Sequence, residues 1–178
     1  MLFRSAQRKA RSLGFKPDLG LEKHGAYIKW MGIRGMKWQD LAATVQHKLR
    51  SSPPPKVLLI HLGSNDLVDT HGSALGKVVT QDLHNLHALL PDTVLIWSEV
   101  LPRRTWQGAD NPAAVDRKRK RLNRRAILAI SQLGGKVVRH GIVPGDPGLY
   151  RDDNVHLSDV GTALFINAIQ ETLSEVFE

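Results

Sequence analysis

The amino-acid sequence predicts an α/β fold that is built from strand–helix repeats. Three short runs, residues 57–62, 93–97 and 136–139, are mostly apolar and bounded by turn residues, as strands of a buried parallel sheet are. Each run is followed along the chain by a longer segment whose apolar residues recur at helical spacing. Alternating strands and helices favour a parallel sheet with helices on both faces, and we therefore expect a three-layer α/β/α architecture.

The other predicted elements follow from the same two periodicities and from residues that start or stop helices. Gly14 and Pro91 mark helix ends, and Ser158 is a favoured N-cap residue. Residues 26–31 alternate as a short strand does, and glycines at 32–35 close it. We expect that strand and five helices, at residues 2–13, 38–49, 74–90, 112–133 and 158–177.

Composition sets the broad class of the protein. The chain has 178 residues, 42% of them hydrophobic and 24% charged, which fits one globular domain over residues 1–178. It has no cysteine, which excludes disulfides and thiolate chemistry. Because no apolar run is long enough for a membrane span and no apolar core follows the first charges, we expect a soluble intracellular protein.

The positive charge is unevenly placed. The net charge is +8; residues 1–50 hold 11 Lys/Arg against 3 Asp/Glu, whereas residues 51–178 hold 14 of each. Two basic segments stand out, Arg4–Arg11 and Arg117–Arg125. Such segments attract nucleic acid or an acidic membrane, and the alternative is an ordinary solvated helix face.

Polar residues gather where the predicted strands end. In parallel sheets ligands bind beyond the carboxyl ends of the strands. The loops at that edge carry Gly32 and Gly35, then Asn65, and finally Asp153 with His156. The sequence therefore predicts a functional site at this edge.

The residue types of these loops fit a hydrolytic site. His156 can take a proton from a hydroxyl group and return it to a leaving group, and Asp153 or Asp152 can orient its ring. The Asn65 amide can donate to a developing oxyanion, as can a backbone N–H at Gly35 or Gly32. The alternative for Asn65 is an Asx-turn or a helix cap.

These motifs together resemble the SGNH, or GDSL-type, hydrolase family. Gly63-Ser64-Asn65-Asp66 is similar to the family's Gly-x-Asn-Asp block, and the segment from Asp153 to His156 is similar to its Asp-x-x-His block. The turn from Gly32 to Gly35 resembles its glycine block, with Gly35 as the expected oxyanion donor. The resemblance implies a flavodoxin-like sheet and ester hydrolysis of small or lipid-like substrates through a serine, with no metal and no organic cofactor.

The family's nucleophilic block has no counterpart in this chain. In the family the serine ends the first strand, just before the first helix, and residues 2–13 match that helix. Ser5 is the nearest serine, but no strand precedes it as a nucleophile elbow requires. We therefore expect an N-terminally truncated domain that lacks the first strand and the nucleophile, and that is weakly active or inactive.

A closer likeness concerns other stretches of the chain. Residues 32–41, 97–108 and 156–165 look like SGNH domains in vertebrate retroelement reading frames. That likeness suggests an alternative function, a non-catalytic module that binds nucleic acid or acidic membrane through the two basic segments.

Overall fold

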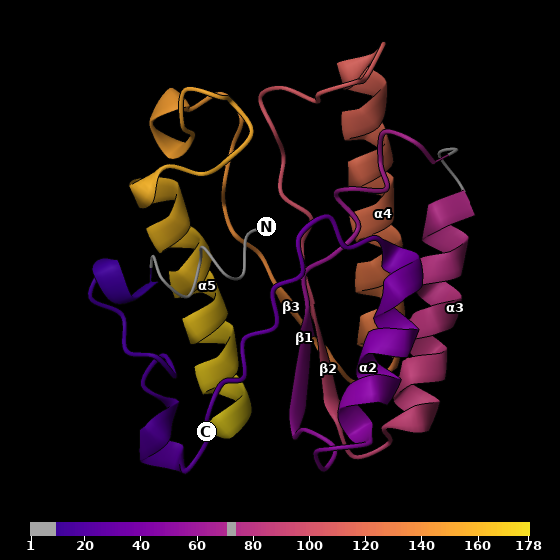
Figure 1. The fold of residues 1–178 in the computed structure, drawn as a ribbon, viewed down its shortest axis with the longest axis vertical. Helices are drawn as coiled ribbons and strands as arrows, with labels where there is room; N and C mark the ends of the chain where they lie inside the picture. The colour runs from indigo at the N-terminus through magenta and orange to yellow at the C-terminus, as the bar shows by residue number, and fades with distance from the viewer. Residues whose placement is uncertain (1–9, 71–73) are drawn as a thin grey trace. The chain divides into compact units, whose positions relative to one another are not determined.

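The computed structural model describes residues 10–70 and 74–178. They form two compact units. The sheet unit comprises residues 36–100 and 106–138, and the α5 unit comprises residues 10–35, 101–105 and 139–178. Figure 1 shows their helices and strands.

The sheet unit is built around three parallel strands, β1 (Val57–Ile60), β2 (Val94–Ser98) and β3 (Lys136–Val138). They lie in the order β1-β2-β3, with Leu58 opposite Leu95 and Trp97 opposite Val137. Gly135, the residue before β3, lies so close to β2 that only glycine fits: a Cβ there would lie 2.3 Å from the Leu95 carbonyl oxygen. The predicted α/β class with a parallel sheet is confirmed.

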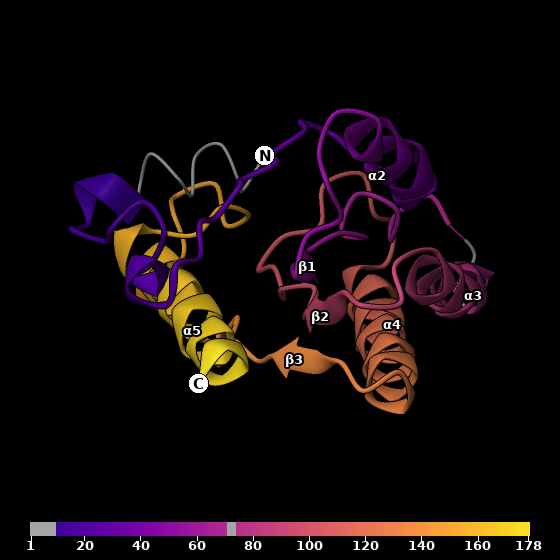
Figure 2. The ribbon, with the colours of Figure 1, turned by 90° about the horizontal axis from the view of Figure 1, so that it is seen from below.

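Three helices of this unit lie on the same side of its sheet (Figures 1 and 2). They are α2 (Leu41–Leu49), which a short 3₁₀ turn at Trp38–Asp40 precedes, α3 (Ala74–Leu89) and α4 (Pro112–Gln132). Asn111 caps α4 by accepting a hydrogen bond from the Ala114 N–H, and Pro112 takes the first helical position, where its missing N–H costs nothing.

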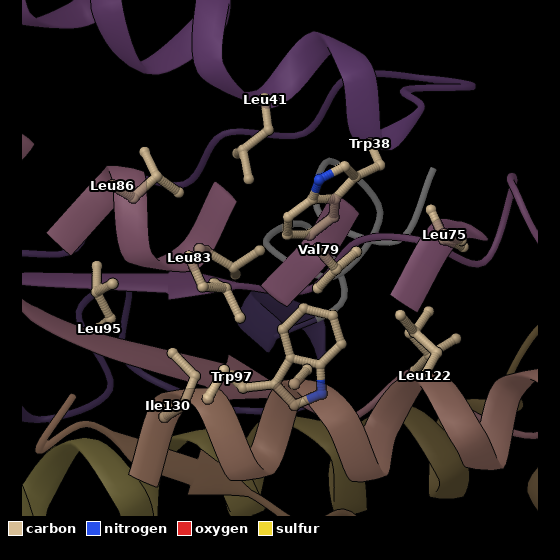
Figure 3. Packing of buried hydrophobic residues seen from close by; sticks show 14 of the residues in the cluster. Trp38, Leu41, Leu75, Val79, Leu83, Leu86, Leu95, Trp97, Leu122 and Ile130 are labelled. Carbon is tan, nitrogen blue, oxygen red and sulfur yellow. The ribbon is translucent and has the colours of Figure 1, made fainter. Parts of the chain in front are cut away.

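The core of the sheet unit lies between these helices and the sheet. Trp97 of β2 is fully buried and lies beside Trp38, with 6.0 Å between ring centroids. Figure 3 shows leucines and valines of α2, α3 and α4 packed around the two indoles. Alternation along β2 explains this packing, because Leu95 and Trp97 point to the same face of the sheet.

The α5 unit contains the long helix α5 (Asp159–Phe177) and two short 3₁₀ helices, η1 (Leu21–His24) and η3 (Pro147–Leu149). Both short helices pack against α5. Phe165 of α5 is fully buried and stacks on the His140 ring, with centroids 4.4 Å apart. The Gln170 amide donates to the Leu19 carbonyl, which ties the first described residues to this helix.

The N-terminal part of the chain departs from one sequence prediction and leaves another mostly undescribed. The strand prediction for residues 26–31 is wrong: they form no ladder, and Tyr27 is 83% exposed. The sheet of the described residues consists of β1, β2 and β3 and does not include this segment, whose alternate side chains Ala26, Ile28 and Trp30 are only half-buried. Of the helix predicted at 2–13, residues 10–13 are described; residues 10–12 are helical and Leu13 lies in the turn that follows.

Candidate active site

The most specific arrangement is the pair that Asp153 and His156 form in the loop before α5. Asp153 Oδ2 lies 2.6 Å from His156 Nδ1. Its other oxygen, Oδ1, accepts from the backbone N–H groups of Val155 and His156, at 2.9 and 2.8 Å. The carboxylate therefore closes its own turn and holds the imidazole at the same time.

The loop that carries the pair is itself closed by backbone pairing. Tyr150 and Leu157 form an antiparallel bridge, and the Arg151 N–H donates to the His156 carbonyl at 2.8 Å. Asn154 turns the chain with φ 58°, a left-handed conformation that asparagine tolerates better than most residues. The ends of the loop are therefore fixed, and His156 has a defined backbone position.

Residues 101–105 brace this loop from a distant part of the sequence. The backbone N–H groups of Arg104 and Thr105 both donate to the Asn154 carbonyl, each at 3.1 Å. The buried Tyr150 hydroxyl donates to the Pro102 carbonyl at 3.1 Å. These bonds restrain the turn in addition to its own bridge, which limits the movement of the His156 backbone.

The start of α5 anchors the other end of the loop. Ser158 accepts from the Gly161 N–H at 3.1 Å as the helix cap, and its hydroxyl donates to the Gly148 carbonyl at 2.6 Å. Gly161 lets the helix approach η3, because a Cβ there would lie 2.2 Å from the Leu149 carbonyl oxygen. Ser158 is thus occupied by capping, as its position in the sequence predicts.

Hydrogen bonding favours the ionised form of the Asp153 carboxyl. The His156 backbone N–H, the His156 side chain and the Val155 N–H hold the pKa of the Asp153 carboxyl well below its usual range. An ionised carboxylate only accepts hydrogen bonds, so an imidazole in its neutral form would donate from Nδ1 and leave Nε2 as the proton acceptor. Asp152, the other carboxylate considered, contributes its backbone carbonyl, which accepts from the Asn154 side chain at 3.1 Å.

Asn65 lies in the sheet unit, in the turn that follows β1. The turn opens at Gly63, whose φ of 109° favours glycine. The exposed Asn65 amide donates to the Met36 carbonyl at 3.0 Å. An amide nitrogen has two hydrogens, so this bond orients Asn65 and leaves one N–H for another acceptor.

Asp66 holds the same turn against the segment that precedes α2. Both carboxylate oxygens lie 3.2 Å from the Trp38 backbone nitrogen. Burial raises the pKa of the Asp66 carboxyl, while the Trp38 N–H and the charge of Lys37 oppose that shift. Asp66 is thus a structural residue that fixes Asn65 in place.

Gly35 directly precedes Met36, whose carbonyl accepts from Asn65. It is exposed with φ 70°, and a Cβ there would meet no described atom within 4 Å. The structure thus brings Asp153 to His156 in the α5 unit, and it brings Asn65 to the residue after Gly35 in the sheet unit. Ser5 lies outside the described residues.

Sequence reasoning missed the role of Asn154 and one further pair. The turn composition Asp152-Asp153-Asn154 signals the left-handed residue, but nothing local signals that Arg104 and Thr105 bind its carbonyl. The second pair is Ser98 at the end of β2 with His61 beyond β1, where Ser98 Oγ lies 2.9 Å from His61 Nδ1. Ser98 is completely buried, so we assign that pair to the structure of the sheet edge.

Among the residues that the structure describes, no group of three or more His, Cys, Asp or Glu side chains could hold a metal ion. No helix of residues 10–70 and 74–178 has the length and apolar character that crossing a membrane requires.

Comparison with known proteins supports the fold. No family model and no curated protein matches the chain. A crystal structure of a GDSL-like lipase from Bacteroides thetaiotaomicron is similar with a TM-score of 0.69 and 16% identity, over 99% of this chain and 83% of that chain. A second crystal structure has a TM-score of 0.53 and 15% identity, over 74% of this chain and 70% of that chain. The chain therefore has an α/β fold similar to that of a GDSL-like lipase.

Proposed function

We propose that the chain carries the general-base and oxyanion parts of a carboxyl-ester hydrolase site of the SGNH kind. The observation that carries the proposal is the Asp153–His156 pair, at 2.6 Å, in a loop that is closed on both sides. The likeness of the fold to a GDSL-like lipase supports the reaction class. The roles of the individual residues follow from their hydrogen bonding.

His156 acts as the base in this proposal. Asp153 holds Nδ1–H, and Nε2 accepts the proton of the attacking hydroxyl or water. The side chains of both residues are about two-fifths exposed, at 43% for His156 and 42% for Asp153, which leaves the ring accessible. Oriented general-base catalysis contributes about 10²- to 10⁴-fold to a rate.

Asn65 and Gly35 are the proposed oxyanion donors. Asn65 keeps one amide hydrogen beyond its bond to the Met36 carbonyl, and Gly35 presents an exposed backbone N–H with no side chain above it. A preorganised donor of this kind contributes about 10²- to 10³-fold to kcat. In a complete site they stabilise the tetrahedral oxyanion that forms when the carbonyl carbon is attacked.

The serine nucleophile is not assigned to any described residue. In the complete reaction the serine oxygen attacks the ester carbonyl, the alcohol leaves with a proton from His156, and water then hydrolyses the acyl-enzyme. Ser158 caps α5 and Ser98 is buried against His61. We propose that this chain by itself is weakly active, with His156 activating water directly, and that its substrates are small or lipid-like esters.

The test is hydrolysis of p-nitrophenyl butyrate by the purified chain and by two variants. We expect a slow rate above buffer that falls by at least about tenfold in His156→Ala, because the base is lost. His84→Ala is the matched control, since His84 is an exposed histidine on α3. Equal rates for His156→Ala and the unchanged chain, or no rate above buffer, would contradict the proposal.

The closer likeness to retroelement SGNH domains stays a prediction. Of the two basic segments behind the alternative function, Arg4–Arg11 lies mostly outside the described residues, whereas the segment in α4 is described in full.

A further inference from the structure

Four arginines of α4 form an exposed face, which we call the arginine face. They are Arg117, Arg121, Arg124 and Arg125, and each is exposed. No hydrogen bond or ion pair to the described residues engages any of their guanidinium groups. At i, i+4, i+7 and i+8, these residues share one side of the helix, spread over about 12 Å at 1.5 Å per residue.

The other cations of α4 bond to acceptors of the protein itself, which sets the arginine face apart. Lys118 donates to the carbonyls of Leu67 and Thr70, at 3.2 and 2.8 Å. Arg119 and Lys120 both pair with Asp116, at 2.7 and 3.0 Å. The helix thus carries three cations that are engaged by acceptors of the protein and four arginines whose guanidinium groups no described residue engages.

No carboxylate of α4, or of α3, which packs against α4, neutralises the arginine face. Asp116 is the single acidic residue of α4 and is already paired. Asp82 is the single acidic residue of α3, and it accepts from the Trp38 indole N–H at 2.8 Å. Arg125 runs along α3, since a Cβ on Gly76 would lie 2.7 Å from its Cδ, and this restrains one of the four side chains.

From this arrangement we infer that the arginine face binds the phosphate backbone of a nucleic acid. Guanidinium groups bind phosphate oxygens bidentately, and unpaired arginines in a row match a linear array of phosphates. A DNA duplex carries one negative charge per about 1.7 Å of axis, so about 12 Å of helix faces more phosphates than it has arginines. Non-specific binding of this kind needs no base contacts.

The apolar side of α4 argues against a membrane as the partner. A helix that lies in a membrane interface buries its apolar face in lipid. In α4 that face is already buried in the core of the sheet unit, through Val115, Leu122, Ala126 and Ile130. Leu128 is the one large apolar side chain of α4 that is well exposed, at 61%. The helix offers charge without an apolar surface to insert.

The test measures binding of a fluorescein-labelled 20-base-pair DNA duplex by fluorescence anisotropy at several salt concentrations. Four phosphate contacts contribute a slope of about −3.6 in log K against log salt, which weakens binding about 150-fold between 50 and 200 mM salt. The variant Arg117→Gln/Arg121→Gln/Arg124→Gln/Arg125→Gln should lose most of that slope and bind at least about tenfold more weakly at low salt.

A matched control distinguishes the effect of the arginine face on DNA binding from the effect of net charge. The variant Arg50→Gln/Lys56→Gln/Lys77→Gln/Arg139→Gln also removes four positive charges, from scattered exposed positions. We expect it to keep most of the slope, and circular dichroism should show both variants folded. Equal losses in the two variants, or no binding by the unchanged chain, would overturn the inference. So would binding to phosphatidylserine vesicles without binding to the duplex, which would assign the face to a membrane.

Discussion

The substitution Asp153→Asn tests the orientation of His156 without depending on catalytic rate. An asparagine has nearly the same shape, and its carbonyl oxygen can still accept from the Val155 and His156 backbone N–H groups, as Asp153 Oδ1 does. The amide nitrogen then faces His156 Nδ1, where it cannot accept a hydrogen bond. The loop should remain closed, but Nδ1–H loses the carboxylate oxygen that accepts its hydrogen bond.

The size of the effect follows from the geometry of the pair. A hydrogen bond to a charged group contributes about 1.5–3 kcal/mol when it is well protected. The two side chains are 42% and 43% exposed, so solvent screening reduces this to about 1 kcal/mol, or about a fivefold change in tautomer ratio. The Nδ1–H tautomer should therefore dominate in the unchanged chain and lose its advantage in the variant.

Nitrogen-15 NMR of the imidazole at a pH where it is neutral reads this ratio directly. Asp152→Asn is the matched control, because its carboxylate lies one residue away and contacts neither ring nitrogen in the described structure. We expect it to leave the His156 tautomer unchanged. The reasoning is refuted if Asp153→Asn keeps the Nδ1–H tautomer, or if Asp152→Asn shifts it as much.

Three further predictions concern pH, the oxyanion donor and the core. Because hydrogen bonds lower the pKa of folded Asp153, its contribution to stability is present above the ordinary pKa of about 4 and is lost as pH falls toward the folded value. In urea unfolding, the difference in free energy of unfolding between the unchanged chain and Asp153→Asn should therefore shrink below pH 4. A difference that stays constant with pH would contradict this. Asn65→Ala should lower hydrolysis of p-nitrophenyl butyrate about 10²-fold, whereas an unchanged rate would remove Asn65 from the site. Asn123→Ala should cost about 1–3 kcal/mol in urea unfolding, because buried Asn123 bonds the Val100 N–H and carbonyl at 2.9 and 3.0 Å; an effect no larger than that of the exposed control Asn85→Ala would refute that assignment.

The strands that sequence reasoning located were those with strong local signals. The apolar runs around Val57–Ile60 and Val94–Ser98 have the right length, and turn residues bound them. The segment 26–31 has the same alternation of apolar and polar residues but is not a strand. Alternation indicates that one face could be buried, and it does not show that a partner strand lies beside the segment. Pairing is a long-range property that one sequence does not encode locally.

The candidate site shows the same division between local and distant interactions. The spacing of Asp153 and His156 predicts a contact that the structure contains, because three residues of a tight turn bring the two side chains together. The bonds from Arg104 and Thr105 to the Asn154 carbonyl join segments about 50 residues apart, and no motif announces them. Hydrogen bonds between backbone groups do not depend on the residue type, so the sequence does not indicate them.

The most direct test of the esterase proposal is labelling with a fluorophosphonate serine probe, located by peptide mass spectrometry. It should be run on this chain and on the chain with any coding sequence that precedes Met1 restored. We predict labelling of one serine in the extended form and its loss in His156→Ala, since the probe needs a nucleophile that the base activates. Absence of labelling in both forms, or labelling that survives His156→Ala, would contradict a hydrolase site built on Asp153 and His156.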